Sequence, residues 1–259
     1  MSPQVSQPLP PALSRPLATP IKIDKLQAYL EGYPPRQYLI EGFRFGFFID
    51  YVGHRSNFVS KNLLSATTNP KAVDEKLAKE IQLGRIVGPF DGQPFPVFHV
   101  SPLGLIPKKV PGEFRLIHHL SFPEGRSINS HILQIASSVH YTNIDDAIRL
   151  IRRTGRGCTL AKTDIKNAFR LIPVSPSPLC WRDRFYVDRN FAMGLSSSCK
   201  IFECFSSALE WIACFRLHVP GILHLLDDFL IVSKSLALCA NDLQVFLKTC
   251  DELGVPMAP

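Results

Sequence analysis

The chain has 259 residues, of which 46% are hydrophobic, so it can bury a sizeable core and is not intrinsically disordered. Its 29 basic and 22 acidic residues give a formal charge of +7, a modest excess that favours a polyanionic partner. The sequence shows neither a secretion leader nor a run of about 18 apolar residues, which argues against secretion and a membrane span.

Residues 1–20 contain six prolines and predict an extended or disordered lead-in. Residues 21–69 form an N-terminal extension, in which "IKIDKLQAYL" has a helical pattern and "FRFGFFIDYV" has aromatic, strand-like pieces. Seven cysteines occur in the later part of the chain without a C-x-x-C pair, which argues against disulfides and a zinc site. We therefore expect reduced thiols and an intracellular protein, with nucleus and cytoplasm both open.

Four amphipathic helices alternate with strands in the rest of the chain. The first follows Asn69, a predicted N-cap, and stops at Gly84. The others are expected over 142–153, after Ser196, and over 236–253. The strand-like segments between them include "CTLAKTD" and "DRFYVDRNF".

Three acidic residues lie at the ends of strand-like segments. Asp164 ends the strand pattern of "TLAKTD", where a turn or a helix cap would also explain it. Asp227 and Asp228 interrupt "GILHLLDDFLIVS", which predicts a tight hairpin with the pair at its tip, and a solvated turn is the alternative. If the three met, they could hold two magnesium ions for phosphoryl chemistry, and the ions would neutralise charges that apolar surroundings penalise.

A second pattern is basic. In "SPLGLIPKKVPGEFRLIHHLS", a two-residue loop at Pro111 and Gly112 would place Lys108 directly across from Arg115. Like charges in opposed positions destabilise a hairpin, so the arrangement fits a bound anion such as a triphosphate. An L-Pro-Gly turn is not the type preferred in two-residue hairpins, so the register can slip. Solvated surface charge is the alternative interpretation.

Four motifs occur in the order, and roughly at the spacing, of the fingers and palm motifs of retroelement reverse transcriptases: "SPLGLIPKK…FRLIHHLS", "AKTDIKNAFRLIPV", "MGLSSSCKIFE" and "HLLDDFLIV". Over residues 70–259 the chain resembles the polymerase region of DIRS-type or related retrotransposons. The resemblance implies an α+β fold with the fingers and palm of a right-hand polymerase. Its palm would be an antiparallel sheet packed on helices, with a ferredoxin-like core.

The resemblance implies an RNA-directed DNA polymerase that adds deoxynucleoside triphosphates to a primer on an RNA or DNA template. Asp164 and Asp227 would bind two Mg²⁺ ions, with Mn²⁺ as a possible substitute. Asp228 would be the third carboxylate. Such a palm works mainly by positioning and electrostatics, without a covalent enzyme intermediate.

The resemblance also assigns residues to the nucleotide. Lys108 and Arg115 would hold its triphosphate, and Phe169 would lie under the incoming sugar and exclude a ribose 2′-hydroxyl. Gly194 would let the backbone approach the nucleotide and the template. A core phenylalanine is the alternative for Phe169, and a turn glycine before a helix is the alternative for Gly194.

Relatives of this kind continue beyond "GVPMAP" with a thumb and a ribonuclease H region, so the resemblance implies a truncated polymerase with poor grip on its template. Two other functions stay open. One is a non-catalytic, nucleic-acid-binding remnant of a retrotransposon polymerase. The other is a nucleotidyl cyclase, which shares carboxylates on a ferredoxin-like sheet but needs neither a template grip nor a sugar gate.

Overall fold

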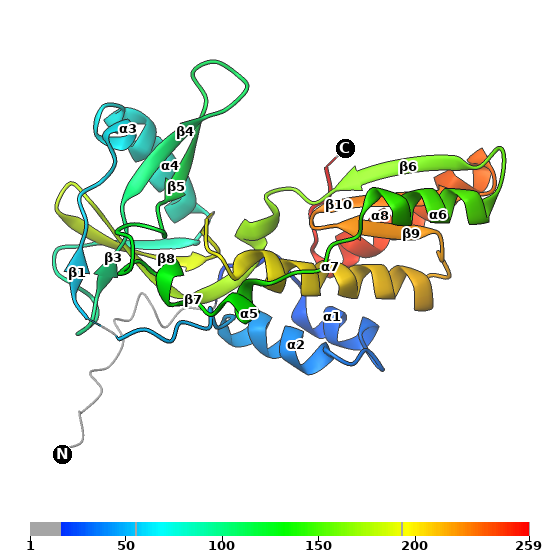
Figure 1. Cartoon of the computed structure of the whole chain (residues 1–259), viewed down its shortest axis with the longest axis horizontal. Helices are drawn as coiled ribbons and strands as arrows, with labels where there is room; N and C mark the ends of the chain where they lie inside the picture. Colours follow the sequence, from blue (N-terminus) through cyan, green and yellow to red (C-terminus); the bar gives the residue numbers. More distant parts are fainter. Residues whose placement is uncertain (1–16, 55, 193, 259) are drawn as a thin grey trace. The chain divides into compact units, whose positions relative to one another are not determined.

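The structure, a computed structural model, describes residues 17–54, 56–192 and 194–258 (Figure 1). The predicted lead-in lies, up to residue 16, outside the described residues. The chain divides into two compact units, each assembled from separate stretches. The first unit contains residues 17–18, 48–133 and 174–195, and the second contains 19–47, 134–173 and 196–258. Both combine helices with strands, which confirms the α+β class.

The first unit contains three small sheets. One is a parallel pair, one is three-stranded in the order β2-β8-β7, and one is an antiparallel hairpin. Their strands are β1 (Phe58–Val59) with β3 (His99–Val100), then β2 (Ile86–Phe90), β8 (Arg184–Asn190) and β7 (Pro173–Trp181), then β4 (Leu103–Pro107) with β5 (Phe114–His118). The helices are α3 (Leu64–Thr67), α4 (Pro70–Gln82) and the 3-10 helix η2 (Asn129–His131).

Helix α4 confirms the first predicted helix, because it starts at Pro70 directly after Asn69. Its apolar face buries Val73 and Leu77 in a core cluster that also contains Trp181 of β7. The indole N–H of Trp181 donates to a carboxylate oxygen of Asp74 at 2.8 Å. Apolar packing and this hydrogen bond together fix α4 on the sheets of the first unit.

The second unit contains most of the helices and one antiparallel sheet in the order β6-β10-β9. The strands are β6 (Thr159–Asp164), β9 (Ile222–Leu225) and β10 (Asp228–Ser233). The helices are α1 (Ile23–Tyr29), α2 (Arg36–Phe45), α5 (Gln134–Ser137), α6 (Ile144–Thr154), the 3-10 helix η3 (Ala168–Leu171), α7 (Ser198–Phe215) and α8 (Leu236–Leu253). The three helices predicted in this part of the chain are confirmed as α6, α7 and α8.

One strand-like assignment was wrong. The first part of "FRFGFFIDYV" belongs to helix α2, not to a strand. Its Phe43 is fully buried and packs edge-to-face on Phe205 of α7, with 5.0 Å between the ring centroids. Packing of this helix face on a neighbouring helix therefore outweighed the strand preference of the aromatic residues.

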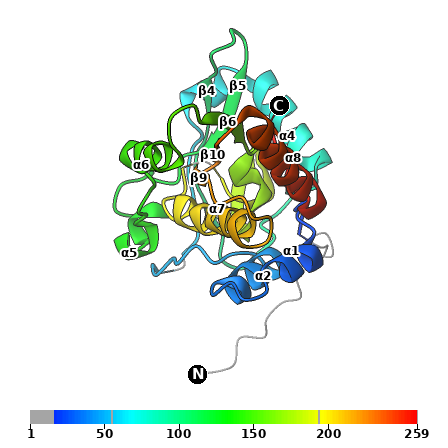
Figure 2. The ribbon, with the colours of Figure 1, turned by 90° about the vertical axis from the view of Figure 1, so that its right-hand side faces the viewer.

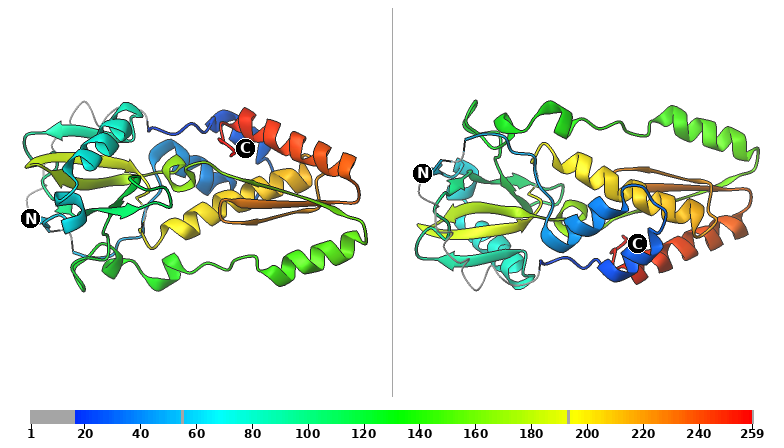
Figure 3. Two further views of the ribbon diagram at one scale, coloured as in Figure 1. Left: turned by 90° about the horizontal axis from the view of Figure 1, so that it is seen from above. Right: turned by 90° about the horizontal axis from the view of Figure 1, so that it is seen from below.

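Helices α7 and α8 lie on one face of the sheet, as the views in Figures 2 and 3 show. Phe229 of β10 points to that face and meets Phe246 of α8, with 5.1 Å between the ring centroids. Side chains alternate along a strand, so Asp228 points to the opposite face. That opposite face carries the candidate site.

Helix α1 and the stretch before it pack against the end of α8. The N–H of Lys22 donates to the carbonyl of Leu253 at 2.8 Å, and the hydroxyl of Tyr29 donates to Glu252 at 3.0 Å. Gly254 has φ +78, and a Cβ there would come within 2.0 Å of the carbonyl oxygen of Pro20. Only glycine therefore allows the two segments to approach this closely.

Within residues 17–54, 56–192 and 194–258, every helix falls short of the combination of length and hydropathy that crossing a bilayer requires.

Candidate active site

Asp227 lies in a two-residue turn between β9 and β10. Leu225 is the register partner of Asp228, so Leu226 and Asp227 form the turn itself. This confirms the predicted tight hairpin but moves its tip by one residue, because Asp228, expected at the tip with Asp227, is the first residue of β10. Leu226 has φ +52, a left-handed conformation that non-glycine residues adopt rarely.

Strand β6 brings Asp164 next to this turn. Asp164 is the register partner of Asp228, so the two residues share a face of the sheet. The N–H of Ile165 donates to the carbonyl of Asp227 at 2.9 Å, which ties the turn to the end of β6. The N–H of Ala258 donates to the carbonyl of Asp164 at 2.8 Å from the other side. The three carboxylates therefore meet at one end of the sheet, although Asp164 precedes Asp227 by 63 residues in the sequence.

The carboxylates repel one another. Burial raises the pKa of Asp227 above its ordinary value, and the charges of Asp228 and Asp164 raise it further. Lys162, two residues before Asp164 and on the same face, forms an ion pair with Asp228 at 3.0 Å. The hydrogen bond and charge of Asp228 raise the pKa of Lys162, and Lys162 in turn lowers that of Asp227.

The donor set fits magnesium as an open site. Mg²⁺ prefers one or two carboxylates and fills its other positions with water and phosphate oxygens, and a divalent ion would relieve the repulsion at Asp227. Asp164, Asp227 and Asp228 are each partly exposed, so their oxygens are accessible to such ligands. Among the described residues, no three His, Cys, Asp or Glu side chains form a ready-made cage for a metal ion.

The predicted register of the basic hairpin was wrong. Arg115 pairs with Ile106, not with Lys108, so the loop covers residues 108–113, which adds three residues before the predicted Pro-Gly turn and one after it. The N–H of Lys108 donates to the carbonyl of Glu113 at 2.8 Å, and its Nζ forms an ion pair with the Glu113 carboxylate at 3.0 Å. The L-Pro-Gly dipeptide does not match the twist of a two-residue hairpin, and the longer loop with a Lys-Glu pair replaces the opposed like charges.

The two remaining residues from the resemblance lie in different units. Phe169 is in η3 of the second unit, half-buried, and its ring packs on Phe202 of α7 with 5.2 Å between centroids. Gly194 belongs to the first unit, has φ +99, and its carbonyl accepts a hydrogen bond from Asn129 at 2.7 Å. Met193, which precedes it in the motif, lies outside the described residues. The positive φ explains the glycine by backbone conformation alone.

The sequence analysis did not identify two residues near the turn as candidate site residues, Lys162 and His224. Lys162 could have been found from its two-residue spacing to Asp164, which places both side chains on one face of a strand. His224 stands in an apolar strand three residues before Asp227, and it is buried against Glu203 of α7. Its partner is 21 positions away on another element, so no local motif reveals the pair.

No family model and no curated protein matches the sequence. Several solved structures are similar. The foamy viral protease-reverse transcriptase in complex with double-stranded DNA is 13% identical, with a TM-score of 0.60, over 97% of this chain and 44% of that chain. The foamy viral protease-reverse transcriptase with an RNA/DNA hybrid is 13% identical, with a TM-score of 0.59, over 97% of this chain and 34% of that chain. A prototype foamy virus protease-reverse transcriptase is 14% identical, with a TM-score of 0.58, over 80% of this chain and 25% of that chain.

These similarities establish that the chain has a reverse transcriptase-like fold. The chain spans less than half the length of these three structures.

Proposed function

We propose that the chain is the RNA-directed DNA polymerase domain of a retroelement, of DIRS type or related, with the first unit as fingers and the second as palm. The observation that carries the proposal is the register of β6 and β10. It puts Asp164 opposite Asp228 and beside the turn of Asp227, on a reverse transcriptase-like fold. Structures with this fold have been solved with double-stranded DNA and with an RNA/DNA hybrid, which supports a template and primer as partners.

In this proposal Asp164 and Asp227 would hold two Mg²⁺ ions, or Mn²⁺ in their place. Asp228, at the same end of the sheet, would be the third carboxylate. The bound ions supply charge stabilisation to the in-line attack of the primer 3′-hydroxyl on the α-phosphate. The protein's own contribution is a fixed backbone: the Ile165 N–H holds the Asp227 carbonyl, so the two catalytic carboxylates keep their spacing. Pyrophosphate leaves, and the primer is one deoxynucleotide longer.

The other site residues bind the nucleotide in this proposal. Lys108 and Arg115 contact the triphosphate, where charged hydrogen bonds are strongest. Phe169, held by its packing on Phe202, presents its ring edge to the sugar and excludes a 2′-hydroxyl by steric contact. Gly194 leaves room for the backbone to approach the nucleotide.

Primer extension on an RNA template with Mg²⁺ and deoxynucleoside triphosphates tests this function. We expect Asp164→Asn and Asp227→Asn each to lower incorporation more than about 100-fold, because each removes a metal ligand worth several kcal/mol in the transition state. Asp251→Asn, an exposed carboxylate of α8, is the matched control and should stay within about twofold of the wild type. Incorporation that survives both active-site changes would contradict the assignment.

A second candidate is a non-catalytic nucleic-acid-binding remnant. It is favoured by the excess of 29 basic over 22 acidic residues, which suits a polyanionic partner without requiring a metal ion. It predicts that the wild-type protein binds an RNA/DNA hybrid in a salt-sensitive way but gives no metal-dependent extension. Extension above the level of the Asp227→Asn variant excludes it.

A further inference from the structure

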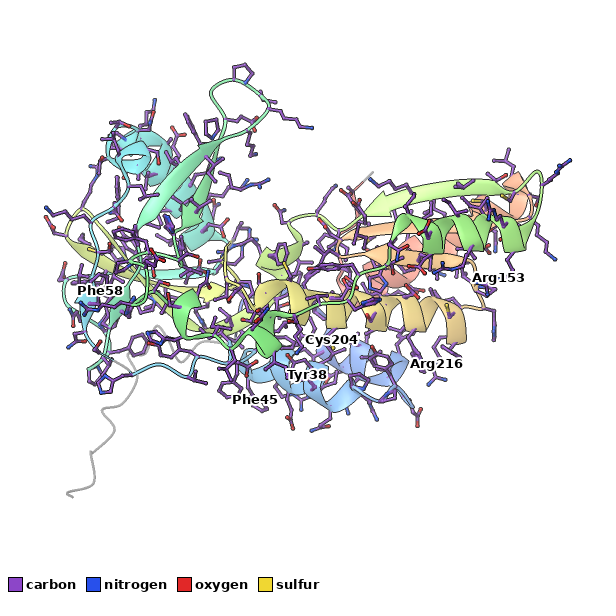
Figure 4. All side chains as sticks on the ribbon, viewed as in Figure 1. Tyr38, Phe45, Phe58, Arg153, Cys204 and Arg216 are labelled. Carbon is purple, nitrogen blue, oxygen red and sulfur yellow. The ribbon has the colours of Figure 1, made fainter. Side chains whose placement is uncertain are left out.

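A cluster of three ionisable side chains, with a buried histidine at its centre and two partly buried glutamates, lies next to the turn that carries Asp227. His224 of β9 is only 7% exposed, and its ring faces α7. Its Nδ1 lies 2.5 Å from Oε2 of Glu210, and its Nε2 lies 3.1 Å from Oε1 of Glu203. Positions 203 and 210 are about two turns apart, so both glutamates lie on one face of the helix. In Figure 4 this part of α7 is marked by Cys204.

The geometry favours a charged ring. An ionised carboxylate only accepts hydrogen bonds, so a ring nitrogen bonded to one donates a proton; both nitrogens of His224 lie next to a glutamate, and Nε2 also lies 3.4 Å from the hydroxyl of Ser207. Burial alone would lower the pKa of His224, but its hydrogen bonds to Glu203 and Glu210 outweigh burial and raise the pKa to about 9. The neighbour on β10 is the apolar ring of Phe229, with 5.8 Å between centroids. At neutral pH the His224 ring is therefore protonated where it lies between the two glutamates.

Glu203 connects this cluster to the turn. Its Oε2 accepts a hydrogen bond from the backbone N–H of Leu226 at 3.3 Å, while its Oε1 faces His224. Leu226 directly precedes Asp227 and has the positive φ of 52, a conformation that persists only where the surroundings constrain it. One carboxylate thus holds both the buried ring and the strained residue of the turn.

We propose that His224 is a positioning residue for the turn: it fixes Glu203 against the Leu226 N–H, and this holds the Asp227 carboxylate where it can bind a divalent ion. The inference rests on the proposed function, because that function makes Asp227 a metal ligand. Glu210 holds the other ring nitrogen and is one step further from the turn. A cluster that only fastened α7 to β9 would need no bond to Leu226.

Matched variants separate positioning from general support of the fold. Glu203→Ala removes the bridge to Leu226, whereas Glu203→Gln keeps an oxygen that can accept from its N–H. Glu210→Gln is the control, because it makes the same change of charge on the same helix without altering the side chain that reaches the turn. His224→Gln removes the ring. Three experiments are made on each variant: Mn²⁺ binding by electron paramagnetic resonance, primer extension for kcat and KM, and thermal unfolding for the midpoint.

We expect Glu203→Ala and His224→Gln to raise the Kd for Mn²⁺ about tenfold. The same variants should lower kcat about 10- to 100-fold with the KM for the nucleotide unchanged, the usual effect of losing a partner that orients a metal ligand. Glu203→Gln should restore most of the Mn²⁺ binding, and Glu210→Gln should stay within about threefold of the wild type. Equal losses in Glu203→Ala and Glu203→Gln, or losses that simply follow the unfolding midpoints, overturn the proposal.

A second test uses the wild-type protein alone, so it does not depend on whether a variant folds. In NMR spectra, the amide resonances of Leu226 and Asp227 should shift with the same pH midpoint as the ring of His224, because Glu203 connects them. Independent midpoints overturn the proposal.

The proposed function can fail separately. If Asp227→Asn weakens Mn²⁺ binding but the wild type incorporates no nucleotide, the polymerase assignment is wrong and the Mn²⁺ data alone decide whether His224 positions the turn. Mn²⁺ binding that Asp227→Asn leaves unchanged overturns both proposals.

Discussion

Asp227 illustrates how single residues at the site balance opposing charges. Its carboxylate is partly buried next to Asp228 and Asp164, and all three effects disfavour its charged form. Lys162 offsets part of this repulsion, but it is exposed and engaged with Asp228. An exposed ion pair of this kind contributes little to stability. Repulsion among the carboxylates around Asp227 therefore persists in the folded protein. A bound cation stabilises such a site most, because it relieves this repulsion.

His224 gives the clearest prediction for pH. Its pKa is raised from 6.5 to about 9 in the folded protein. A group with a raised pKa stabilises the fold fully below its unfolded value, and this contribution disappears as pH rises through the folded value. We expect the free energy of unfolding of the wild type to fall by up to about 3 kcal/mol between pH 6.5 and 9, relative to His224→Gln. Urea unfolding at a series of pH values measures this difference, and parallel curves for the two proteins would show that the ring is not charged in the fold.

At the scale of elements, the two hairpins differ in how well their strand register could be predicted from the sequence. The β9-β10 hairpin was predictable because two apolar strands flank the acidic pair, although the turn contains Leu226 and Asp227 and not both acids. The β4-β5 hairpin was not, because its ends are exposed and nothing apolar fixes the pairing near Lys108. Register is specified where one face is buried and slips where it is not.

The nucleotide contact of the β4-β5 hairpin can be tested by kinetics. If Lys108 binds the triphosphate, Lys108→Ala should raise the KM for deoxynucleotides about tenfold, since a charged hydrogen bond contributes roughly 1.5 to 3 kcal/mol. Glu113→Gln is the matched change: it removes the ion partner of Lys108 and should leave KM unchanged or lower it. A KM that stays the same in Lys108→Ala identifies this lysine as solvated surface charge.

Helices and strand ends were predictable, whereas contacts between distant segments were not. The alternation and capping patterns located α4, α6, α7 and α8 because these signals are local. The assignment of "FRFGFF" failed because the burial of Phe43 against Phe205 joins segments far apart in sequence. The cluster of His224, Glu203 and Glu210 was invisible for the same reason. The three acidic residues could be singled out because strand ends, a hairpin and the resemblance mark them, and their role as metal ligands stays a prediction.

At the scale of the whole molecule, each unit is assembled from separate stretches of the chain, so strands distant in sequence must pair before the site exists. The pairing of β6 with β10 joins residues 159–164 to residues 228–233. Until that pairing forms, Asp164 and Asp227 are unrelated carboxylates. The site is therefore a property of the folded second unit and not of any one motif.

The excess of basic residues predicts how the whole chain binds nucleic acid. With a formal charge of +7, we expect the Kd for an RNA/DNA hybrid to rise at least about tenfold between 50 and 200 mM salt, because counterions are released from the phosphates. A variant carrying both Asp164→Asn and Asp227→Asn should bind with the same salt dependence, since in the proposed function these two carboxylates bind metal ions and do not contact phosphates through basic groups. Fluorescence anisotropy measures both, and salt-independent binding contradicts a phosphate-dominated interface.

The most direct measurement is a crystal structure of the protein with a template and primer, a non-hydrolysable deoxynucleotide and Mn²⁺, whose anomalous signal locates the ions. The account predicts Mn²⁺ bound to carboxylate oxygens of both Asp164 and Asp227, at about 2.1 to 2.2 Å and in contact with the triphosphate. An anomalous map with the nucleotide in place but no ion at these two carboxylates would contradict it.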